Sequence, residues 1–277
     1  GTYQYAYDAV GNMTSLTNAK GNMISYTYDA NNRLIQMQYP DNSSVTFAYD
    51  ANGNRTGMVD NIGTSGYSYD VLNRMTSCTD SFGKTVAYGY YANGNRASLT
   101  YPDGNKVSYT YDAMNRIATV TDWLTREAIY TYDAAGNLVQ TLNSNNTKAT
   151  YTYDAAERLA GLWNTKSDSS VISSYTYTLD AIGNHSSVVK EEPLVPILSA
   201  QNISYTYDAE NRLTDTGGTA YTYDANGNLT GRGSDTFSYD YENRLSQSNI
   251  GGTATQYNYD GLGNRLEKSV DGANTGY

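Results

Sequence analysis

Hydrophobic and polar positions alternate along this chain in short stretches that polar turns separate. Before each turn the sequence reads aromatic-x-Tyr, and after it come runs such as Arg33-Leu-Ile-Gln-Met-Gln-Tyr39 and Arg116-Ile-Ala-Thr-Val-Thr121. Alternation with a period of two residues is typical of β-strands. The pattern therefore predicts a strand on each side of every turn.

The turns follow a recurrent Tyr-Asp pair. Eleven copies read aromatic-x-Tyr-Asp, and two degenerate copies keep the register, one with Tyr91 in place of Asp and one stretched to Asp180. Most continue as Ala-x-Gly-Asn or Ala-x-Asn-Arg. Asp accepts hydrogen bonds from backbone N–H groups two residues on, and Gly or Asn tolerates the left-handed conformation that closes a type I turn with a bulge. We predict thirteen hairpins, with structural turn residues Asp8, Asp29, Asp50, Asp70, Asp112, Asp133, Asp154, Asp180, Asp208, Asp224, Asp240 and Asp260, and repeat aromatics Tyr7, Tyr28, Tyr49, Tyr69, Tyr90, Tyr111, Tyr132, Tyr153, Tyr177, Tyr207, Tyr223, Tyr239 and Tyr259.

The spacing of the pairs predicts a single repeat array over residues 1–277 with three stretches. Regular repeats of about 21 residues fill 1–174, a degenerate repeat with an insertion fills 175–204, and shorter terminal repeats fill 205–277. Residues 186–204 hold two of the four prolines and an apolar segment. We expect this stretch to leave the sheet as an ordinary surface loop.

A second turn must reverse the chain between hairpins, so each repeat supplies two antiparallel strands. About 26 strands at roughly 4.8 Å extend on the order of 125 Å, and a twisted sheet of that length does not stay flat and open. Closed in one turn it would be roughly 40 Å across, wider than side chains can fill. We predict an all-β fold of antiparallel hairpin repeats, a continuous ribbon coiled into a hollow spiral or shell. One face carries tyrosines and aliphatic side chains, the other Thr, Ser and Ala.

Composition narrows the function. The 30 tyrosines, against 3 Phe and 2 Trp, mean that aromatic rings supply much of the burial. A net charge of -10 argues against a nucleic acid partner, and no apolar run reaches membrane-spanning length. The single Cys78 allows no internal disulfide. The chain opens directly in a strand-like stretch, so we expect it to be an excerpt of a longer protein.

The stretches Tyr109-Thr-Tyr-Asp-Ala-Met-Asn-Arg-Ile117 and Tyr221-Thr-Tyr-Asp-Ala-Asn-Gly-Asn-Leu229 closely resemble the YD repeat of the Rhs family. That family includes bacterial Rhs and WapA-type polymorphic toxins, the B and C subunits of insecticidal Tc toxin complexes, and the teneurins. The resemblance extends over essentially the whole sequence. It implies a β-ribbon wound into a large hollow shell that, in toxin members, encloses a C-terminal toxin domain, and it implies secretion or a place at the bacterial cell surface. The family's self-cleaving core segment has no counterpart before Tyr277, so no catalytic residue carries over and only the repeat array is expected here.

The residues themselves predict no catalytic, cofactor or metal site. The turn aspartates come singly, about 20 residues apart, unlike the clustered ligands of calcium-binding repeats. The only histidine, His185, lacks an evident Ser or Asp partner, and we expect it to be a solvent-exposed turn residue. Adjacent Glu191 and Glu192 are expected to be a solvated charge pair.

Our leading hypothesis is a structural scaffold of a secreted bacterial Rhs-type protein, not an enzyme, that forms part of a β-shell around a toxin or effector domain of the same longer polypeptide. Two alternatives stay open. The chain is an extracellular carbohydrate-binding or cell-surface adhesion module if its tyrosine faces stack on glycans. It is a self-assembling extracellular fibre if ribbon edges near Tyr3 and Tyr257 pair between chains.

Overall fold

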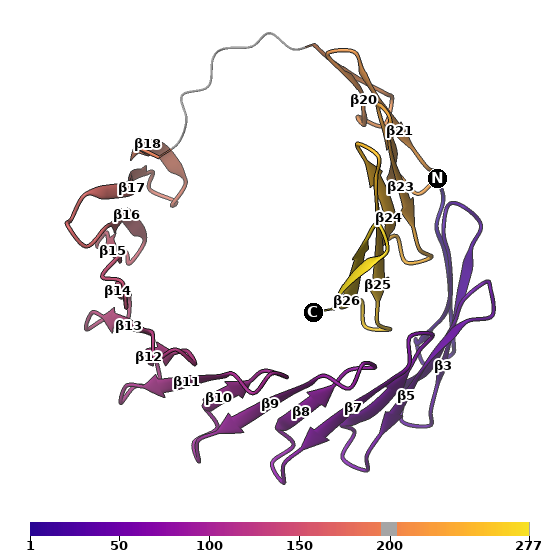
Figure 1. The fold of residues 1–277 in the computed structure, drawn as a ribbon, viewed down its shortest axis with the longest axis horizontal. Coiled ribbons are helices and arrows are strands. Elements are labelled where there is room, and N and C mark those ends of the chain that lie inside the picture. The colour runs from indigo at the N-terminus through magenta and orange to yellow at the C-terminus, as the bar shows by residue number, and fades with distance from the viewer. Residues whose placement is uncertain (195–203, 277) are drawn as a thin grey trace. The chain divides into compact units, whose positions relative to one another are not determined.

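The computed structural model describes residues 1–194 and 204–276, and this part of the protein is built of strands joined by turns (Figure 1). Among these residues no helix is long and apolar enough to cross a membrane. The strands are β1 (Gln4–Tyr7), β2 (Met13–Thr17), β3 (Met23–Tyr28), β4 (Leu34–Gln38), β5 (Ser44–Tyr49), β6 (Arg55–Val59), β7 (Thr64–Tyr69), β8 (Met75–Thr79), β9 (Thr85–Tyr90), β10 (Arg96–Thr100), β11 (Lys106–Tyr111), β12 (Ile117–Thr121), β13 (Glu127–Tyr132), β14 (Leu138–Asn143), β15 (Lys148–Tyr153), β16 (Leu159–Thr165), β17 (Val171–Leu179), β18 (His185–Glu191), β19 (Tyr205–Tyr207), β20 (Leu213–Thr216), β21 (Thr219–Tyr223), β22 (Leu229–Arg232), β23 (Asp235–Tyr239), β24 (Leu245–Ile250), β25 (Thr253–Tyr259), β26 (Arg265–Val270) and β27 (Ala273–Gly276).

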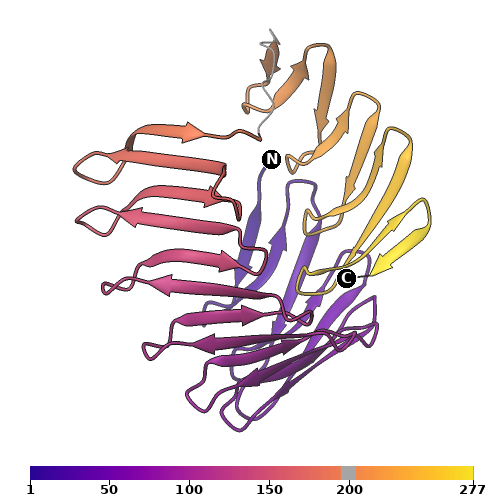
Figure 2. The same ribbon diagram turned by 60° about the vertical axis from the view of Figure 1, so that its left-hand side comes forward.

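These strands fall into an 18-stranded sheet, β1 to β18, and a nine-stranded sheet, β19 to β27. The protein also divides into two compact units, one made of residues 1–84 and 201–277 and the other of residues 85–200. Within the second unit, Figure 2 shows β11 to β18 as successive hairpins in a single layer. Repeat spacing in the sequence divides the array into residues 1–174, 175–204 and 205–277. This division differs from that of the two compact units and stays a prediction.

The Tyr-Asp hairpins share one register, and β3 with β4 illustrates it. Tyr26 lies opposite Met37 and Tyr28 opposite Leu34, with a bulge between Thr27 and Tyr28. The fourth turn residue, Asn32, has a φ of 59°, which is the left-handed conformation that closes a type I turn with a bulge. Alternation along β3 puts both tyrosines on one face, and the bulge, which leaves Ile35 of β4 unpaired, brings Leu34 and Met37 to that same face.

The linking turns between hairpins explain the change in repeat spacing. Early linking turns also have a left-handed fourth residue, such as Gly21 with a φ of 82°. In the terminal repeats, two-residue turns replace them, with φ positive at both residues of Gly217-Gly218 and Gly251-Gly252. Two consecutive positive φ values define a type I′ turn, which glycine adopts without steric cost. Together with short strands such as β20 and β22, the tighter turns bring the spacing down to 16 residues at Asp224 and Asp240, whereas longer β24 and β25 keep it at 20 residues across Gly251-Gly252.

Apolar side chains gather on one face of the sheet. Met37, Val45, Phe47 and Met58 form a buried cluster, with partly buried tyrosines packed around it. On the other face, small polar side chains meet across the strands, as where the hydroxyl oxygens of Thr110 and Thr119 lie 2.8 Å apart. The predicted division into a tyrosine-aliphatic face and a small polar face is confirmed.

Two predictions about the ends of the sheets are wrong. The sheet does not end at residue 186, because β18 pairs with β17 through Glu191, and its Val188 lies opposite Tyr177. β-branched residues suit a strand, and they outweigh the prolines that follow. The remainder of the predicted loop, residues 195–203, lies outside the described residues. Tyr257 is not at an edge either, since its strand β25 pairs on both sides.

Candidate functional site

Each turn carboxylate accepts hydrogen bonds from groups of its own turn. In the Asn-Arg type, one oxygen of Asp29 accepts the backbone N–H groups of Asn31 at 2.9 Å and Arg33 at 3.0 Å, and the other accepts Arg33 Nε at 2.7 Å. In the Gly-Asn type, Asp50 accepts the N–H groups of Asn52 and Asn54 and the Asn54 amide at 2.9 Å. The N–H of Arg33, with help from its guanidinium and against partial desolvation, lowers the pKa of Asp29.

Because these oxygens point back into the turn, they do not converge with acids of other repeats. Within the described parts of the protein, no group of three His, Cys, Asp or Glu side chains has a geometry that holds a metal ion. The degenerate turn at Tyr91 keeps the backbone pattern without a carboxylate, since the Tyr91 N–H donates to the Asn95 carbonyl at 2.8 Å.

The two turn types alternate along the thirteen turns, with Glu157 in place of the left-handed Asn in one turn of the Asn-Arg type, a regularity that our sequence analysis missed. Gly-Asn turns give side-chain amides to the left-handed Asn of the next turn: Asn52 and Asn54 both donate to Asn73 Oδ1, at 3.0 Å and 2.7 Å. Asn93 and Asn95 donate in the same way to Asn115. The sequence carries the signal, because Gly-Asn begins at residues 11, 53, 94, 136, 183, 227 and 263 and the Arg of the other type stands at 33, 74, 116, 158, 212 and 244.

Asn-Arg turns couple to the next turn by a different contact. Arg33 Nη1 donates to the carbonyl of Asp50 at 3.1 Å, and its guanidinium lies 4.8 Å from the centre of the Tyr49 ring. Arg244 makes the equivalent bond to the Asp260 carbonyl at 3.2 Å. Amide and guanidinium couplings therefore alternate, and the structural unit is a pair of repeats.

The second tyrosine of the motif links consecutive repeats. The Tyr49 hydroxyl donates to the Leu34 carbonyl at 2.9 Å. Leu34 is the first residue of β4, the strand that follows the preceding Tyr-Asp turn. The sequence hints at this requirement, because the first aromatic of the motif is Phe at Phe47 and Phe237, whereas the second is Tyr in every copy except the degenerate one, where Leu179 precedes Asp180. The same back-bond comes from Tyr28, Tyr69, Tyr111, Tyr132, Tyr153 and Tyr223.

Inside the first unit, residues about 200 positions apart meet along what we call the seam, where linking turns 18–22, 39–43 and 60–63 contact Tyr-Asp turns 224–228, 240–244 and 260–264. Lys20 Nζ lies 3.3 Å from Asp224 Oδ2. The Tyr39 hydroxyl donates to Glu242 Oε2 at 2.7 Å. Asp60 Oδ2 accepts the Gly261 N–H at 2.9 Å. Each linking turn thus has one Tyr-Asp turn as its partner.

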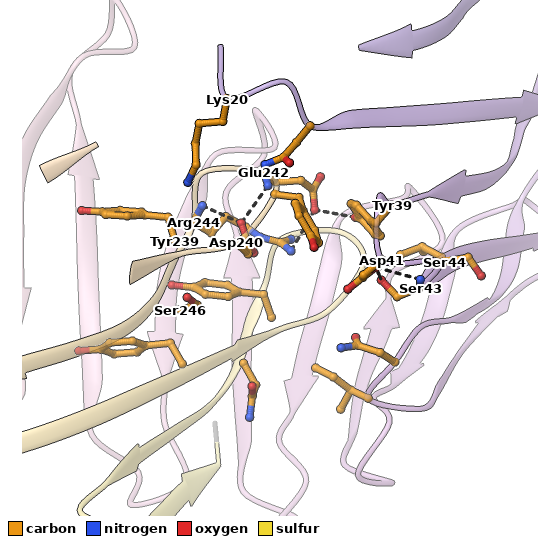
Figure 3. A pocket seen from close by; sticks show the side chains of 18 residues that line it. Lys20, Tyr39, Asp41, Ser43, Ser44, Tyr239, Asp240, Glu242, Arg244 and Ser246 are labelled. Carbon is orange, nitrogen blue, oxygen red and sulfur yellow. Dashed lines mark hydrogen bonds and ion pairs between the residues drawn. The ribbon is translucent and has the colours of Figure 1, made fainter. Parts of the chain in front are cut away.

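A cavity of about 430 Å³ lies beside the seam, lined by tyrosines and polar side chains (Figure 3). Burial, reinforced by the hydrogen bond to Glu242, raises the pKa of Tyr39 above its usual range. Arg244 pairs with Asp240 at 2.6 Å and with Glu242 at 2.9 Å. The guanidinium of Arg244 thus bridges two carboxylates in the cavity wall, and Glu242 in turn accepts the Tyr39 hydroxyl across the seam.

Two other sequence expectations need correction. His185 is exposed but is not a turn residue, because it begins β18 and its ring stacks on that of Tyr177 at 4.6 Å. Glu192 is not merely solvated, since it accepts the Tyr175 hydroxyl at 2.7 Å and pairs with Lys190 at 2.8 Å. Those two contacts lower the pKa of Glu192, the Lys190 contact most.

Comparisons with known proteins agree with this geometry. The RHS Repeat family model matches residues 7–44 and 28–61, and the Teneurin YD-shell family model matches residues 58–177 and 139–276. No curated protein sequence matches this one.

Solved structures with a similar fold are parts of Tc toxins. A crystal structure of TcdB2-TccC3 matches 98% of this sequence at 17% identity with a TM-score of 0.69, and the match spans 20% of the solved protein. A mutant Tc holotoxin pore of Photorhabdus luminescens matches 97% of this sequence at 16% identity with a TM-score of 0.69, over 19% of its own length. The protein thus spans about a fifth of the solved chains that it matches.

The fold predicted from the sequence, an all-β array of antiparallel hairpins of the shell-forming kind, is confirmed by the strand pairings and by this likeness. Matches to the YD-shell family model extend from residue 58 to residue 276, well over half of the sequence. The alternating turns and the tyrosine back-bonds give that match a physical basis. This chain belongs to the Teneurin YD-shell family.

Proposed function

We propose that the protein is a segment of the wall of a β-shell that encloses a C-terminal effector segment of the same longer polypeptide. The observation that carries this proposal is the match over 97–98% of the sequence to TcdB2-TccC3 structures of which it spans about a fifth. A structure of that protein without its hypervariable C-terminal region matches equally well, with a TM-score of 0.68. A wall whose fold does not depend on its content is consistent with an enclosing role.

The chemistry of the repeats favours a wall over an enzyme. Carboxylates such as Asp112 are engaged with backbone N–H groups and the arginine of their own turn, and hydroxyls such as that of Tyr132 with the preceding repeat. Groups committed in this way hold neighbouring strands in register and are not poised to exchange protons with a substrate. We therefore propose that the protein acts through shape.

The proposed partner is the enclosed segment, and the proposed location is outside the cell or at the surface of a bacterium, as for secreted toxins. Neither rival role gains support from a specific contact. The seven tyrosine hydroxyls that bond to the preceding repeat have already donated their proton, so they could serve a glycan only as acceptors. Fibre assembly would need paired ribbon edges between protein copies, and a mass measurement in solution distinguishes it from a discrete shell.

Limited proteolysis of the longer polypeptide that contains this array tests the enclosing role. We expect the C-terminal segment to resist a protease that cleaves the same segment at once when it is expressed alone. Unfolding the wall with denaturant before protease addition should abolish the protection. Cleavage of the segment at equal rates in both settings would show that the wall does not enclose it.

A further inference from the structure

Three of the Gly-Asn turns place an asparagine directly before the glycine, at Asn52, Asn93 and Asn226. All three asparagines donate their side-chain amide to the asparagine of the next turn, at 3.0 Å, 2.9 Å and 2.8 Å. The turns differ at their first residue, which is Asp for the first and third and Tyr91 for the second. This natural substitution makes Asn93 chemically distinct.

We propose that Asn93-Gly94 is a site of spontaneous modification, at which the asparagine amide converts to a carboxylate through a cyclic imide. The backbone nitrogen of Gly94, after losing its proton to solvent hydroxide, attacks Asn93 Cγ. A bond forms between that nitrogen and Cγ, the bond from Cγ to Nδ2 breaks, and ammonia leaves. Water then opens the five-membered ring at either carbonyl, which gives aspartate or isoaspartate, so the net reaction consumes one water and releases one ammonia.

The position of the Asn93 side-chain oxygen favours this attack. The N–H of Asn95 donates to Asn93 Oδ1 at 3.2 Å, so the side chain folds back toward the backbone that follows it. Attack places negative charge on Oδ1, and a backbone N–H already aimed at that oxygen stabilises the charge. The amide orientation is fixed, since Oδ1 must accept from Asn95 and Nδ2 must donate to Asn115.

The turn aspartate prevents the same arrangement elsewhere. In the turn of Asn52, Asp50 Oδ1 accepts the N–H of Asn54 at 2.8 Å, the group that corresponds to the Asn95 N–H. In the turn of Asn226, Asp224 Oδ1 accepts the N–H of Asn228 at 2.9 Å. Each aspartate also accepts the N–H of the asparagine itself, which restrains its backbone.

The glycine itself does not distinguish the sites. Its N–H donates to the carbonyl of the first turn residue in all three turns, at 3.1 Å in Gly53, 3.0 Å in Gly94 and 3.0 Å in Gly227. Breaking that bond costs the same everywhere. Asn52 and Asn93 are both exposed, whereas Asn226 is half-buried in a seam turn. The difference in reactivity between Asn52 and Asn93 therefore rests on the first residue of the turn, and the aspartate at that position protects Asn52 as well as capping the turn.

Conversion would change the coupling between two repeats. Asn115 Oδ1 accepts from both Asn93 and Asn95, and a carboxylate at position 93 replaces one of these donors with a negative charge. Isoaspartate also lengthens the backbone within a turn whose φ values are tightly set. Modified molecules should therefore be loosened locally at this hairpin.

Peptide mapping by mass spectrometry of the folded protein, incubated at mildly alkaline pH, compares the three sites in one sample. We expect acid and isoaspartate to accumulate at Asn93 about tenfold faster than at Asn52 or Asn226, which corresponds to about 1.4 kcal/mol in the barrier. Equal rates, or a faster reaction at either capped site, would overturn the proposal.

Reciprocal variants separate the turn effect from general flexibility. Y91D should bring the rate at Asn93 down to that of the capped sites. D50Y should raise the rate at Asn52, and D50A should do so as well if the tyrosine ring disturbs the hairpin. Circular dichroism confirms that each variant is folded. If the deamidation rates at Asn93 and Asn52 do not change with the first turn residue, the turn aspartate is not the cause of the difference.

Discussion

At the scale of single residues, the Tyr-Asp pair performs two separate tasks. The aspartate satisfies the N–H groups of its own turn, while the tyrosine hydroxyl reaches back to the preceding repeat. Turn formation is local, so its chemistry was predictable from sequence. The tyrosine bond joins residues about 15 positions apart and depends on the strand register, so only its signature, a Tyr before the turn in every copy but one, is visible in the sequence.

Tyr132→Phe tests the back-bond. Removing this hydroxyl leaves the Ile117 carbonyl without its 3.0 Å donor, and we expect a loss of about 1 kcal/mol in unfolding free energy. Tyr130 is the matched control, since its hydroxyl makes no hydrogen bond to the described residues, and Tyr130→Phe should change little. Urea unfolding followed by circular dichroism measures both, and equal effects would contradict the role given to the back-bond.

The turn carboxylates predict acid sensitivity. Backbone N–H groups lower the folded-state pKa of residues such as Asp29, Asp112 and Asp208. A depressed pKa stabilises the fold at every pH above the unfolded value of about 3.9, and this stability is lost as pH falls toward the lower folded values. We expect thermal stability to be level between about pH 7 and 5 and to fall below about pH 4. Melting curves across this range test the sign, and a loss centred near neutrality would contradict it.

At the scale of elements, hairpins, strand alternation and the two faces were predictable because each follows from a pattern within one repeat. The alternation of turn types is also present in the sequence, but its structural role depends on hydrogen bonds between neighbouring turns. Asn93 and Asn95, for example, both donate their amides to Asn115. β18 was missed because two nearby prolines suggested a loop, whereas its valines pair within the sheet. A prediction from local composition therefore missed β18, a strand that pairing with β17 stabilises.

Asn115→Gly isolates the coupling between turns. Asn115 has a φ of 61°, so glycine preserves the backbone and removes only the acceptor of two amides. We expect a loss of about 1 kcal/mol in unfolding free energy. Asn42→Gly is the control, because Asn42 has a φ of 68° in a linking turn and its side chain makes no hydrogen bond to the part of the protein that the structure describes. A similar loss in both variants would assign the effect to glycine flexibility.

At the scale of the whole molecule, the seam is the feature that sequence reasoning could not supply. It joins residues such as Tyr39 and Glu242, and no repeat pattern states which turn meets which. Burial is concentrated there, with Val45 only 3% exposed and Met58 only 1% exposed, although both lie in repeats of ordinary sequence.

Gly261→Ala tests whether the seam is one cooperative contact. A methyl group at Gly261 would collide with Val45 and approach Met58 Sδ to 3.1 Å, and overpacking of this kind costs about 1–3 kcal/mol. The added methyl should push turn 260–264 away from turn 60–63, break the bond from Gly261 N–H to Asp60, and weaken the neighbouring seam contacts in turn. Hydrogen exchange should then accelerate at all three pairs of seam turns and stay slow in the hairpins of residues 106–165. Gly66→Ala is the control, since no atom lies within 4 Å of the added methyl. Acceleration confined to turn 260–264 would mean that the three contacts act independently, and exchange equal to that of the control would mean that the seam does not hold the terminal hairpins in place.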